Sequence, residues 1–434
     1  MKFKRIDQVV ERRLCMGCGA CAAACENQAI TLVDIRNQGI RPIVNADRCQ
    51  QCGGCIEVCP GIDVSHPPFD DRGPIIAELR REWGPALDVW EGYASDPEIR
   101  YCGSSGGAAT ALALFCLEKQ ETSGVLHIGA RQEMPLENTA VYSRSRAELV
   151  ARTGSRYAPA APCEKLSWIQ EASGPSVFIG KPCDVVALRK YQVVNPELNG
   201  KICLAISIFC AGTPTTEGTY KIVEKLGAAP EEAREFRYRG CGWPGATTVT
   251  LKSDDTRAPQ MTYEESWGNI LSKHGQIRCR LCPDSTGEFA DVSCGDPWYR
   301  ELGPNEKGWS LVIARTEKGR RIVQQAQQAS YIDLQKADPR ILPRSQKGLL
   351  GRRRQLWGRL LMMRMMRVPS PHYVGFSLFR SWLGLSVKDK IRSLGGTLKR
   401  IVSRGWTKPL KLTVNPETDY VFPDVTDECR VGQS

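Results

Sequence analysis

The sequence contains no long apolar run, and its first residues include no apolar stretch. Its longest weakly polar segment, residues 105–117, is shorter than the roughly 20 apolar residues that a membrane-spanning helix needs. The opening residues, MKFKRID, lack the apolar core of a secretory signal peptide. We therefore expect a cytoplasmic protein without a membrane-spanning helix.

Histidine is also scarce. The four histidines (His66, His127, His274 and His372) form no pair at a spacing typical of metal ligands. His274 is either a proton donor at a site or an ordinary surface side chain, and we assign no general acid or other catalytic residue from the sequence.

Cysteine, by contrast, occurs 19 times in 434 residues. In a reducing compartment, clustered thiols are expected to be metal ligands or catalytic groups rather than disulfides. Eight of them form two runs, Cys15-x2-Cys18-x2-Cys21-x3-Cys25 and Cys49-x2-Cys52-x2-Cys55-x3-Cys59. This spacing is typical of bacterial ferredoxins, in which each run gives three ligands to one 4Fe–4S cluster and the fourth to the other. The predicted quartets are Cys15, Cys18, Cys21 and Cys59, and Cys25, Cys49, Cys52 and Cys55.

Zinc is the alternative occupant of these runs. Zinc sites, however, favour two separated pairs of cysteines rather than a triplet plus one. One feature departs from the ferredoxin pattern, since Glu26 follows Cys25 where proline is usual. Two clusters in one small domain conduct single electrons and do not catalyse a reaction, so a second site must give or take those electrons.

The rest of the composition (41% hydrophobic, 25% charged) indicates a globular chain of two or three domains. Between residues 88 and 337, short apolar runs alternate with helical patterns, which predicts an α/β sheet. Strands are expected at residues 125–130, 177–180, 202–210 and 311–314, and helices at 106–118, 183–191, 216–226 and 319–329.

The predicted fold class is an α/β catalytic domain with α+β elements, between a bacterial-type ferredoxin domain and a basic helical extension. The predicted boundaries are 1–66 for the dicluster 4Fe–4S domain, 67–87 for a linker, 88–343 for the catalytic domain and 344–434 for the extension and tail. A separable extension implies that residues 344–434 can be removed without loss of the catalytic domain. Residues 412–434 turn acidic and are expected to be extended or disordered.

The basic charge is confined to the extension. Residues 344–411 contain 17 lysines and arginines and a single acid, Asp389, for a net charge of +16, whereas the whole chain has +11. This basic segment, 344–411, in which the tract 351–367 mixes arginines with Leu, Met and Trp, suits peripheral contact with the inner face of an anionic membrane. Docking to an acidic partner and packing onto the catalytic domain are the alternatives, and no nucleic-acid-binding motif accompanies the charge.

Five segments of the central region resemble the beta-subunit family of coenzyme F420-reducing hydrogenases and dehydrogenases, whose relatives include 7-hydroxymethyl chlorophyll a reductase. They are residues 102–112 (CGSSGGAATAL), 180–184 with 187–189, 209–214 (FCAGTP), 236–240 (FRYRG), and 278–284 (RCRLCPD) continuing to 295–298. The resemblance covers residues 88–337 and the ferredoxin domain in front of them.

This resemblance implies an FAD-containing reductase with a third 4Fe–4S cluster beside the flavin. Residues 104–107 open a helix, where free N–H groups could bind a pyrophosphate; a core helix capped by serine is the alternative. The lysine of the 180–184 turn could hold a flavin carbonyl or phosphate. The implied flavin-binding residues are Ser105, Gly106, Gly107, Ser155, Arg156, Tyr157, Gly180, Lys181, Pro182 and Asp184.

The implied ligands of the third cluster are Cys183, Cys210, Cys279 and Cys282. Cys163, Cys241 and Cys294 are the replacements if one of these four is wrong, and Cys102, Cys116, Cys203 and Cys429 are expected to be plain thiols. Asp284, Asp291 and Asp296 are either contacts of substrate or flavin, or caps of turns and helices.

The predicted function is an FAD-dependent iron–sulfur oxidoreductase that passes electrons between a ferredoxin-type donor, its clusters, the flavin and a small organic acceptor, which could be a deazaflavin. The alternatives are a non-catalytic electron-transfer subunit of a larger membrane-associated complex, and an iron–sulfur scaffold that has lost FAD. The sequence does not predict the acceptor, the direction of electron flow or the oligomeric state.

Overall fold

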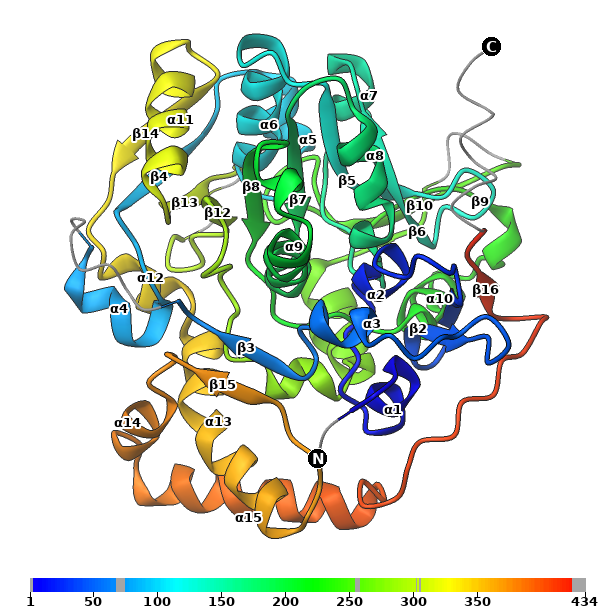
Figure 1. Ribbon diagram of the computed structural model, residues 1–434. Coiled ribbons are helices and arrows are strands. Elements are labelled where there is room, and N and C mark those ends of the chain that lie inside the picture. The colour runs from blue at the N-terminus through cyan, green and yellow to red at the C-terminus, as the bar shows by residue number, and fades with distance from the viewer. Residues whose placement is uncertain (1–2, 68–74, 254–257, 302, 304–305, 424–434) are drawn as a thin grey trace.

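The computed structural model describes residues 3–67, 75–253, 258–301, 303 and 306–423 (Figure 1). Within this part of the chain, no helix is long and apolar enough to cross a lipid bilayer. A central sheet carries helices on its faces, the cysteine-rich N-terminal region lies beside it, and the C-terminal helices form the bottom of the view (Figure 1).

The N-terminal region is built on a hairpin of β1 (Ile30–Ile35) and β2 (Gly39–Val44). Helix α1 (Ile6–Glu11) packs beside it, and the short helices α2 (Ala20–Ala23) and α3 (Gly54–Glu57) lie within the two cysteine runs. Gly19 and Gly53 precede α2 and α3 with φ of 88° and 87°, a left-handed conformation that glycine adopts without strain. The two cysteine runs therefore share one local geometry.

The C-terminal stretch adds a strand to this hairpin. β16 (Tyr420–Val421) pairs antiparallel with β1 through Val33–Val421 and Asp34–Tyr420. The described part of the predicted acidic tail is thus extended and ordered by pairing, and residues 424–434, with Cys429, lie outside the described residues.

Within the described residues, eight strands form the central sheet. Their order is β14 (Ile332–Lys336), β4 (Asp88–Ala94), β13 (Ser310–Ala314), β12 (Val292–Gly295), β8 (Ile202–Ile208), β7 (Ser176–Gly180), β5 (Gly124–Ala130) and β6 (Asn138–Ser143). The four strands from β12 to β5 are parallel, and the strands outside them pair antiparallel. This mixed sheet confirms the predicted α/β class with α+β elements.

The four predicted helices are present as α6 (Ala108–Lys119), α9 (Pro182–Val194), α10 (Thr216–Lys225) and α11 (Glu317–Gln328). Because side chains alternate across a strand, Val177 of β7 packs with α6 and α11 on one face, whereas Phe178 packs with α8 (Leu166–Glu171) and α9 on the other. Ala20 and Val58 of the N-terminal region join this second core. The cysteine-rich region is therefore fixed to the sheet by apolar packing.

Residues 233–281 contain a small separate sheet. Its strands are β9 (Ala233–Arg237), β10 (Thr247–Leu251) and β11 (Gln260–Met261), and the single-turn elements η4 (Glu264–Ile270), η5 (Leu271–His274) and η6 (Arg278–Leu281) follow. The remaining short elements are α5 (Pro97–Cys102), α7 (Arg146–Val150), η1 (Pro162–Lys165), η2 (Pro196–Asn199) and η3 (Pro230–Glu232).

The predicted linker, residues 67–87, contains a packed helix. α4 (Ala77–Trp83) buries Leu79 and Trp83 against β4 and β13. The sequence did not indicate this helix, and residues 68–74 lie outside the described residues.

The C-terminal extension contains α12 (Ile341–Ser345), α13 (Lys347–Met365), α14 (Leu378–Leu383) and α15 (Val387–Ser403). Leu356, Leu360 and Met363 of α13 share a core with Val64 and with Val186 of α9. β15 (His372–Val374) also pairs with β3 (Asp63–Ser65). α13 is therefore packed against both preceding regions, as expected for the alternative in which the extension packs onto the catalytic domain.

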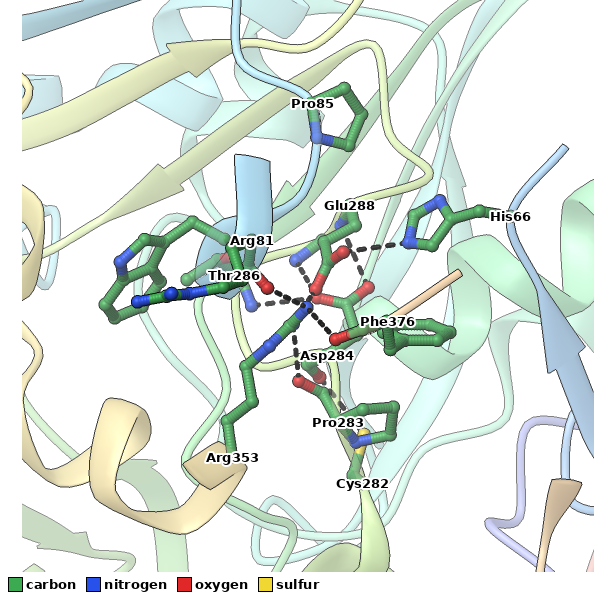
Figure 2. A network of polar contacts seen from close by, with 12 residues as sticks. His66, Arg81, Pro85, Cys282, Pro283, Asp284, Thr286, Glu288, Arg353 and Phe376 are labelled. Carbon is green, nitrogen blue, oxygen red and sulfur yellow. Dashed lines mark hydrogen bonds and ion pairs between the residues drawn. The ribbon is translucent and has the colours of Figure 1, made fainter. Parts of the chain in front are cut away.

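A buried polar network joins the three regions (Figure 2). His66 Nε2 lies 2.8 Å from Glu288 Oε2, and Arg353 of α13 donates to the other carboxylate oxygen. Arg353 also donates to the carbonyls of Pro283 and Phe376. All three side chains are at most 5% exposed, so the Arg353 cation and the Glu288 carboxylate depend on each other for compensation.

Candidate functional site

The first predicted quartet of cysteines lines one hollow in the N-terminal region. Cys15, Cys18, Cys21 and Cys59 surround it together with Gly17, Gly19 and Gly61, and we call these four thiols quartet 1. Each is at most 8% exposed. Burial raises the pKa of Cys59 to about 12, so an isolated thiol here would stay protonated and a cationic centre is needed to make it a ligand.

The second predicted quartet lines a neighbouring hollow. Cys25, Cys49, Cys52 and Cys55 (quartet 2) lie around it, and Cys52 is exposed to solvent. The backbone N–H of Ala29 donates to Cys25 Sγ at 3.3 Å. Among the described residues, no group of three or more His, Cys, Asp or Glu side chains is placed to hold a single metal ion. The thiols instead stand around the walls of two hollows, one buried and one at the surface.

The four cysteines implied for the third cluster also come together. Cys183 lies in the first turn of α9, Cys210 follows β8, Cys279 lies in η6 and Cys282 follows it; we call them quartet 3. Backbone N–H groups of Gly212 and Thr213 donate to Cys210 Sγ and Cys279 Sγ, each at 3.4 Å. Burial, followed by the neighbouring thiols and carboxylates, raises the pKa of Cys210 to about 11 and of Cys282 to about 12.

None of the three replacement cysteines joins quartet 3. Cys163 is buried beside Cys18 and donates to the carbonyl of Asp184, and Cys294 lies in β12 at the sheet core. Cys241 is exposed and lies beside Cys102.

Arg278 connects quartet 1 with quartet 3. Its guanidinium, which is 2% exposed, donates to the carbonyls of Pro60 and Gly61, next to Cys59. It also donates to the carbonyl of Leu281, next to Cys282. One buried cation therefore holds the two cysteine loops against each other.

A large cavity opens at the carboxyl ends of the parallel strands, where α/β sheets bind ligands. With the open solvent at its mouth it measures about 1120 Å³. Its walls come from strand ends, from the start of α6 and from the loop 152–157, and we call it the main cavity. Of the ten predicted flavin-binding residues, eight line it: Ser105, Gly107, Ser155, Arg156, Tyr157, Gly180, Lys181 and Asp184.

The other two predicted flavin-binding residues, Pro182 and Gly106, do not line the main cavity. Pro182 is buried in the first turn of α9. Gly106 lies against β4 and β13, where an added Cβ would approach the Gly92 carbonyl to 2.7 Å. Gly106 thus allows close packing of the loop and is not at the cavity surface.

The start of α6 forms part of the cavity wall. Its N-cap is Gly107, which provides no side-chain hydrogen bond, and Ala108, Ala109 and Thr110 line the cavity. The serine-capped alternative is wrong: Ser104 accepts from Ser155 N at 2.6 Å, and Ser105 donates to the Trp309 carbonyl at 2.9 Å. The first turn therefore offers the N–H groups and the positive helix end that suit an anionic group.

Lys181 and Arg156 bring positive charge to the cavity but are already bonded. Lys181 Nζ donates to Asp184 Oδ2 at 2.7 Å, and although burial lowers its pKa, Asp184 raises it above the ordinary value. Arg156 donates to Asn138 Oδ1 and to the carbonyls of Pro135, Glu137 and Phe236, which fixes its loop.

A second hollow adjoins the main cavity, and the sequence did not predict its function. Tyr157, Tyr263, Trp267, Trp298 and Arg239 line it, and we call it the aromatic hollow. The rings of Tyr263 and Trp298 stack at 5.4 Å, and Arg239 lies over both. The hollow also touches Cys210 and shares Lys181 and Asp296 with the main cavity. A flat ligand there would lie between quartet 3 and the main cavity.

Of the three predicted aspartates, only Asp296 lies at these hollows. It accepts two hydrogen bonds from Arg239, at 2.8 and 3.0 Å, and one from Trp243 Nε1 at 2.8 Å. Asp284 accepts from three backbone N–H groups of its own turn, and Asp291 pairs with Arg189 and Lys318. These two therefore have the structural role that was the alternative.

Two histidines differ in their position relative to these cavities. His274 lies in η5 and lines neither the main cavity nor the aromatic hollow. His127 lines the main cavity, and its Nε2 is hydrogen-bonded to Ser143 Oγ at 2.8 Å. Burial, together with the nearby Arg152, lowers the pKa of His127 to about 4. His127 is therefore neutral at pH 7. A histidine in a predicted strand was the one signal that could have indicated it.

Comparisons with known proteins agree with this arrangement. Residues 14–61 match the 4Fe-4S dicluster domain. Residues 89–167 match the N-terminal part of the coenzyme F420 hydrogenase/dehydrogenase beta subunit, and residues 176–340 match the C-terminal part of the same family.

Two curated relatives are the beta subunits of the F420-dependent formate dehydrogenase of Methanocaldococcus jannaschii and of the coenzyme F420 hydrogenase of Methanothermobacter thermautotrophicus. The first is 27% identical over 56% of this chain and 60% of its own length. The second is 27% identical over 58% of this chain and 84% of its own length. The chain thus spans less than two thirds of the formate dehydrogenase protein.

A chain of the F420-reducing [NiFe] hydrogenase complex from Methanosarcina barkeri has a similar fold. The two align with a TM-score of 0.50 and 20% identity over 77% of this chain and 98% of the other. Together, the matched segments show that the chain belongs to the coenzyme F420 hydrogenase/dehydrogenase beta-subunit family and carries a 4Fe-4S dicluster domain at its N-terminal side.

Proposed function

We propose that this protein is an FAD-dependent iron–sulfur oxidoreductase that passes electrons between a ferredoxin-type protein and an organic acceptor of the deazaflavin class. Its relatives include proteins named as F420-dependent dehydrogenase and F420 hydrogenase subunits, which supports this class of acceptor. When bound, 4Fe–4S clusters supply single-electron transfer, and a flavin converts it into a two-electron transfer.

The observation that carries the proposal is the order of the sites. Quartet 2 reaches the surface at Cys52, quartet 1 is buried next to it, and Arg278 joins quartet 1 to quartet 3. Cys210 of quartet 3 then borders the aromatic hollow, which opens on the main cavity. This continuous order favours a partner protein at quartet 2 and a small acceptor at the aromatic hollow.

The residues in each hollow fit the proposed groups. The 12 cysteines of the three quartets would be cluster ligands, and N–H donors at Cys25, Cys210 and Cys279 suit thiolate sulfur. The first turn of α6 would hold the flavin diphosphate, and the Lys181–Asp184 pair would orient the ring system from the other wall. Stacked Tyr263 and Trp298 would exclude water from a flat acceptor.

Anaerobic purification tests the proposal directly. The expected content is about 12 iron, about 12 acid-labile sulfide and about one FAD per chain, with flavin bands that reduced ferredoxin bleaches. Stoichiometric zinc without sulfide, or a chain that binds iron but takes up no added FAD, would refute it.

A second candidate is a non-catalytic electron-transfer subunit of a larger complex, since several relatives are named as subunits. The isolated chain separates the two. Steady reduction of a deazaflavin by the chain alone supports an enzyme, whereas a flavin that reduces but turns over only with another subunit supports the second candidate.

A further inference from the structure

Helix α15 presents an apolar stripe to solvent. Val387, Ile391, Leu394, Leu398 and Val402 recur at intervals of four and three residues and fall within an arc of about 80° on the helix. Val387 is 71% exposed, Ile391 64%, Val402 69% and Leu398 37%, whereas Leu394, at the edge of the stripe, is half-buried. Burial in the protein's own core does not explain this stripe.

The side of α15 next to the stripe makes the contacts with the rest of the protein. Ser393, Thr397 and Ile401 are buried against α13. At Gly358 of α13, an added Cβ would lie 2.3 Å from Ser393 Oγ, and Trp382 Nε1 donates to the same oxygen at 3.0 Å. Close packing through small side chains therefore fixes the rotation of α15 and holds its apolar stripe outward.

Positive charge flanks the stripe. Lys388, Arg392 and Lys399 are exposed and follow the stripe on one side of the helix. Asp389, the single acid of residues 344–411, is bonded by Ser386 Oγ at 2.8 Å. Phe379 and Leu383 of α14, which contacts α15 through Trp382 and Ser393, are about half exposed as well. We call the outward side of α14 and α15 the basic apolar face.

We propose that the basic apolar face binds the surface of an anionic lipid membrane, with α15 lying in the plane of the interface. An amphipathic helix with lysines and arginines beside its apolar side chains has the features of such interfacial helices. α15 runs along the outer edge of the molecule, so a flat surface can reach its full length (Figure 1).

The charge argues against a second copy of the chain as the occupant. Two copies would bring together segments that each carry a net charge of +16. An anionic bilayer compensates this charge and offers an apolar layer to the stripe. This inference does not depend on the proposed redox function.

The proposal narrows the membrane contact that the sequence predicted for residues 344–411. Within that segment the tract 351–367 lies in α13, where Arg353, Leu356 and Leu360 are buried. α15 is the element whose apolar side chains are free to enter the headgroup layer.

Flotation of the full-length protein with lipid vesicles tests the proposal. The vesicles contain phosphatidylcholine alone or an equal mixture with phosphatidylglycerol. The wild type is expected to float with the anionic vesicles and at most weakly with the neutral ones. Raising the salt concentration about tenfold should weaken the binding, since it screens the charge.

Three variants separate the contributions of the apolar and the basic side chains to vesicle binding. The double variant Ile391→Ser/Leu398→Ser and the triple variant Lys388→Gln/Arg392→Gln/Lys399→Gln should each bind anionic vesicles at least tenfold more weakly. The matched control Val193→Ser removes an equally exposed apolar side chain from α9 and should bind within twofold of the wild type.

The proposal is overturned if the wild type does not bind anionic vesicles, or if both multiple variants bind as the wild type does. It is also overturned if light scattering shows a dimer that the Ile391→Ser/Leu398→Ser variant abolishes while no vesicle binding occurs. In that case a second copy covers the face.

Discussion

Arg353 of α13 and Glu288 of the central domain form an ion pair that is buried on both sides (Figure 2). Because His66 contacts the same carboxylate, this one pair links the C-terminal helices to both preceding regions. Removal of either partner leaves the other as a buried charge without its counter-ion.

Replacement of Arg353 should therefore be costly. Arg353→Met leaves the Glu288 carboxylate buried without its cation and should lower the free energy of unfolding by about 3–5 kcal/mol. Anaerobic denaturant titration measures this change. Arg354→Met is the control, since its partly exposed pair with Glu82 should cost at most about 1 kcal/mol. Equal losses in the two variants would contradict the role of the network.

Removal of the whole extension should have a larger effect. A chain ending at residue 343 loses the apolar core shared by Leu356, Val64 and Val186, and exposes the Glu288 site. We expect it to be recovered as an aggregated or protease-sensitive product. Normal flavin and iron content in this truncated chain would show that the extension is separable after all.

His127, in the wall of the main cavity, should make the free energy of unfolding decrease in acid. His127 has a pKa of about 4 in the fold, against 6.5 for an unperturbed side chain, because it is buried near Arg152. The unfolded chain therefore binds more protons between these values, and the stabilising contribution present above pH 6.5 is lost as the pH falls to about 4. The loss should be about 2–3 kcal/mol.

The variant His127→Gln checks this assignment. It should show a shallower decline of the unfolding midpoint between pH 6.5 and 4, whereas His274→Gln, outside the cavity, should follow the wild type. A wild-type slope in His127→Gln would assign the acid sensitivity elsewhere.

Loss of one N-terminal ligand should be local. Cys18→Ala removes a member of quartet 1 and should reduce the iron content by about four ions per chain, with FAD retained. Cys203→Ala, a thiol beside Cys116 in the sheet core, should keep the full iron content. Loss of FAD from Cys18→Ala would contradict the separation of the cysteine-rich region from the main cavity.

Arg278 should tune the electron path through its charge. Arg278→Met removes a cation between quartets 1 and 3 and should lower the reduction potential of the cluster at quartet 3 by an amount on the order of 100 mV. Arg278→Lys keeps the charge and should restore most of the potential. A redox titration followed by electron paramagnetic resonance measures both, and equal potentials in the two variants would exclude an electrostatic role.

Sequence patterns predicted the parts of the fold that depend on local order. β5, β7, β8 and β13 are short apolar runs, and the helices after them follow periodic patterns, so both were confirmed. β4, which contains Glu91, and β12, a four-residue strand, were missed because their pairing with distant strands gives them their structure.

The candidate site likewise contains parts that local sequence patterns predicted and parts that depend on distant segments. Spacing alone grouped the cysteines of quartets 1 and 2, whereas quartet 3 draws on three separate segments and required the family resemblance. The aromatic hollow was missed because Tyr157, Tyr263 and Trp298 lie far apart in the sequence and come together only in the folded chain. The exposed stripe of α15 was missed because its orientation depends on the contact between Gly358 and Ser393.

The pairing of β16 with β1 has a consequence for biosynthesis. All eight cysteines of quartets 1 and 2 lie within residues 15–59, but the strand that covers the free edge of β1 is synthesised about 360 residues after the last of them. Until that strand has been made, this edge is open to pairing with other chains. Early insertion of the clusters would then protect the nascent domain before its final strand arrives.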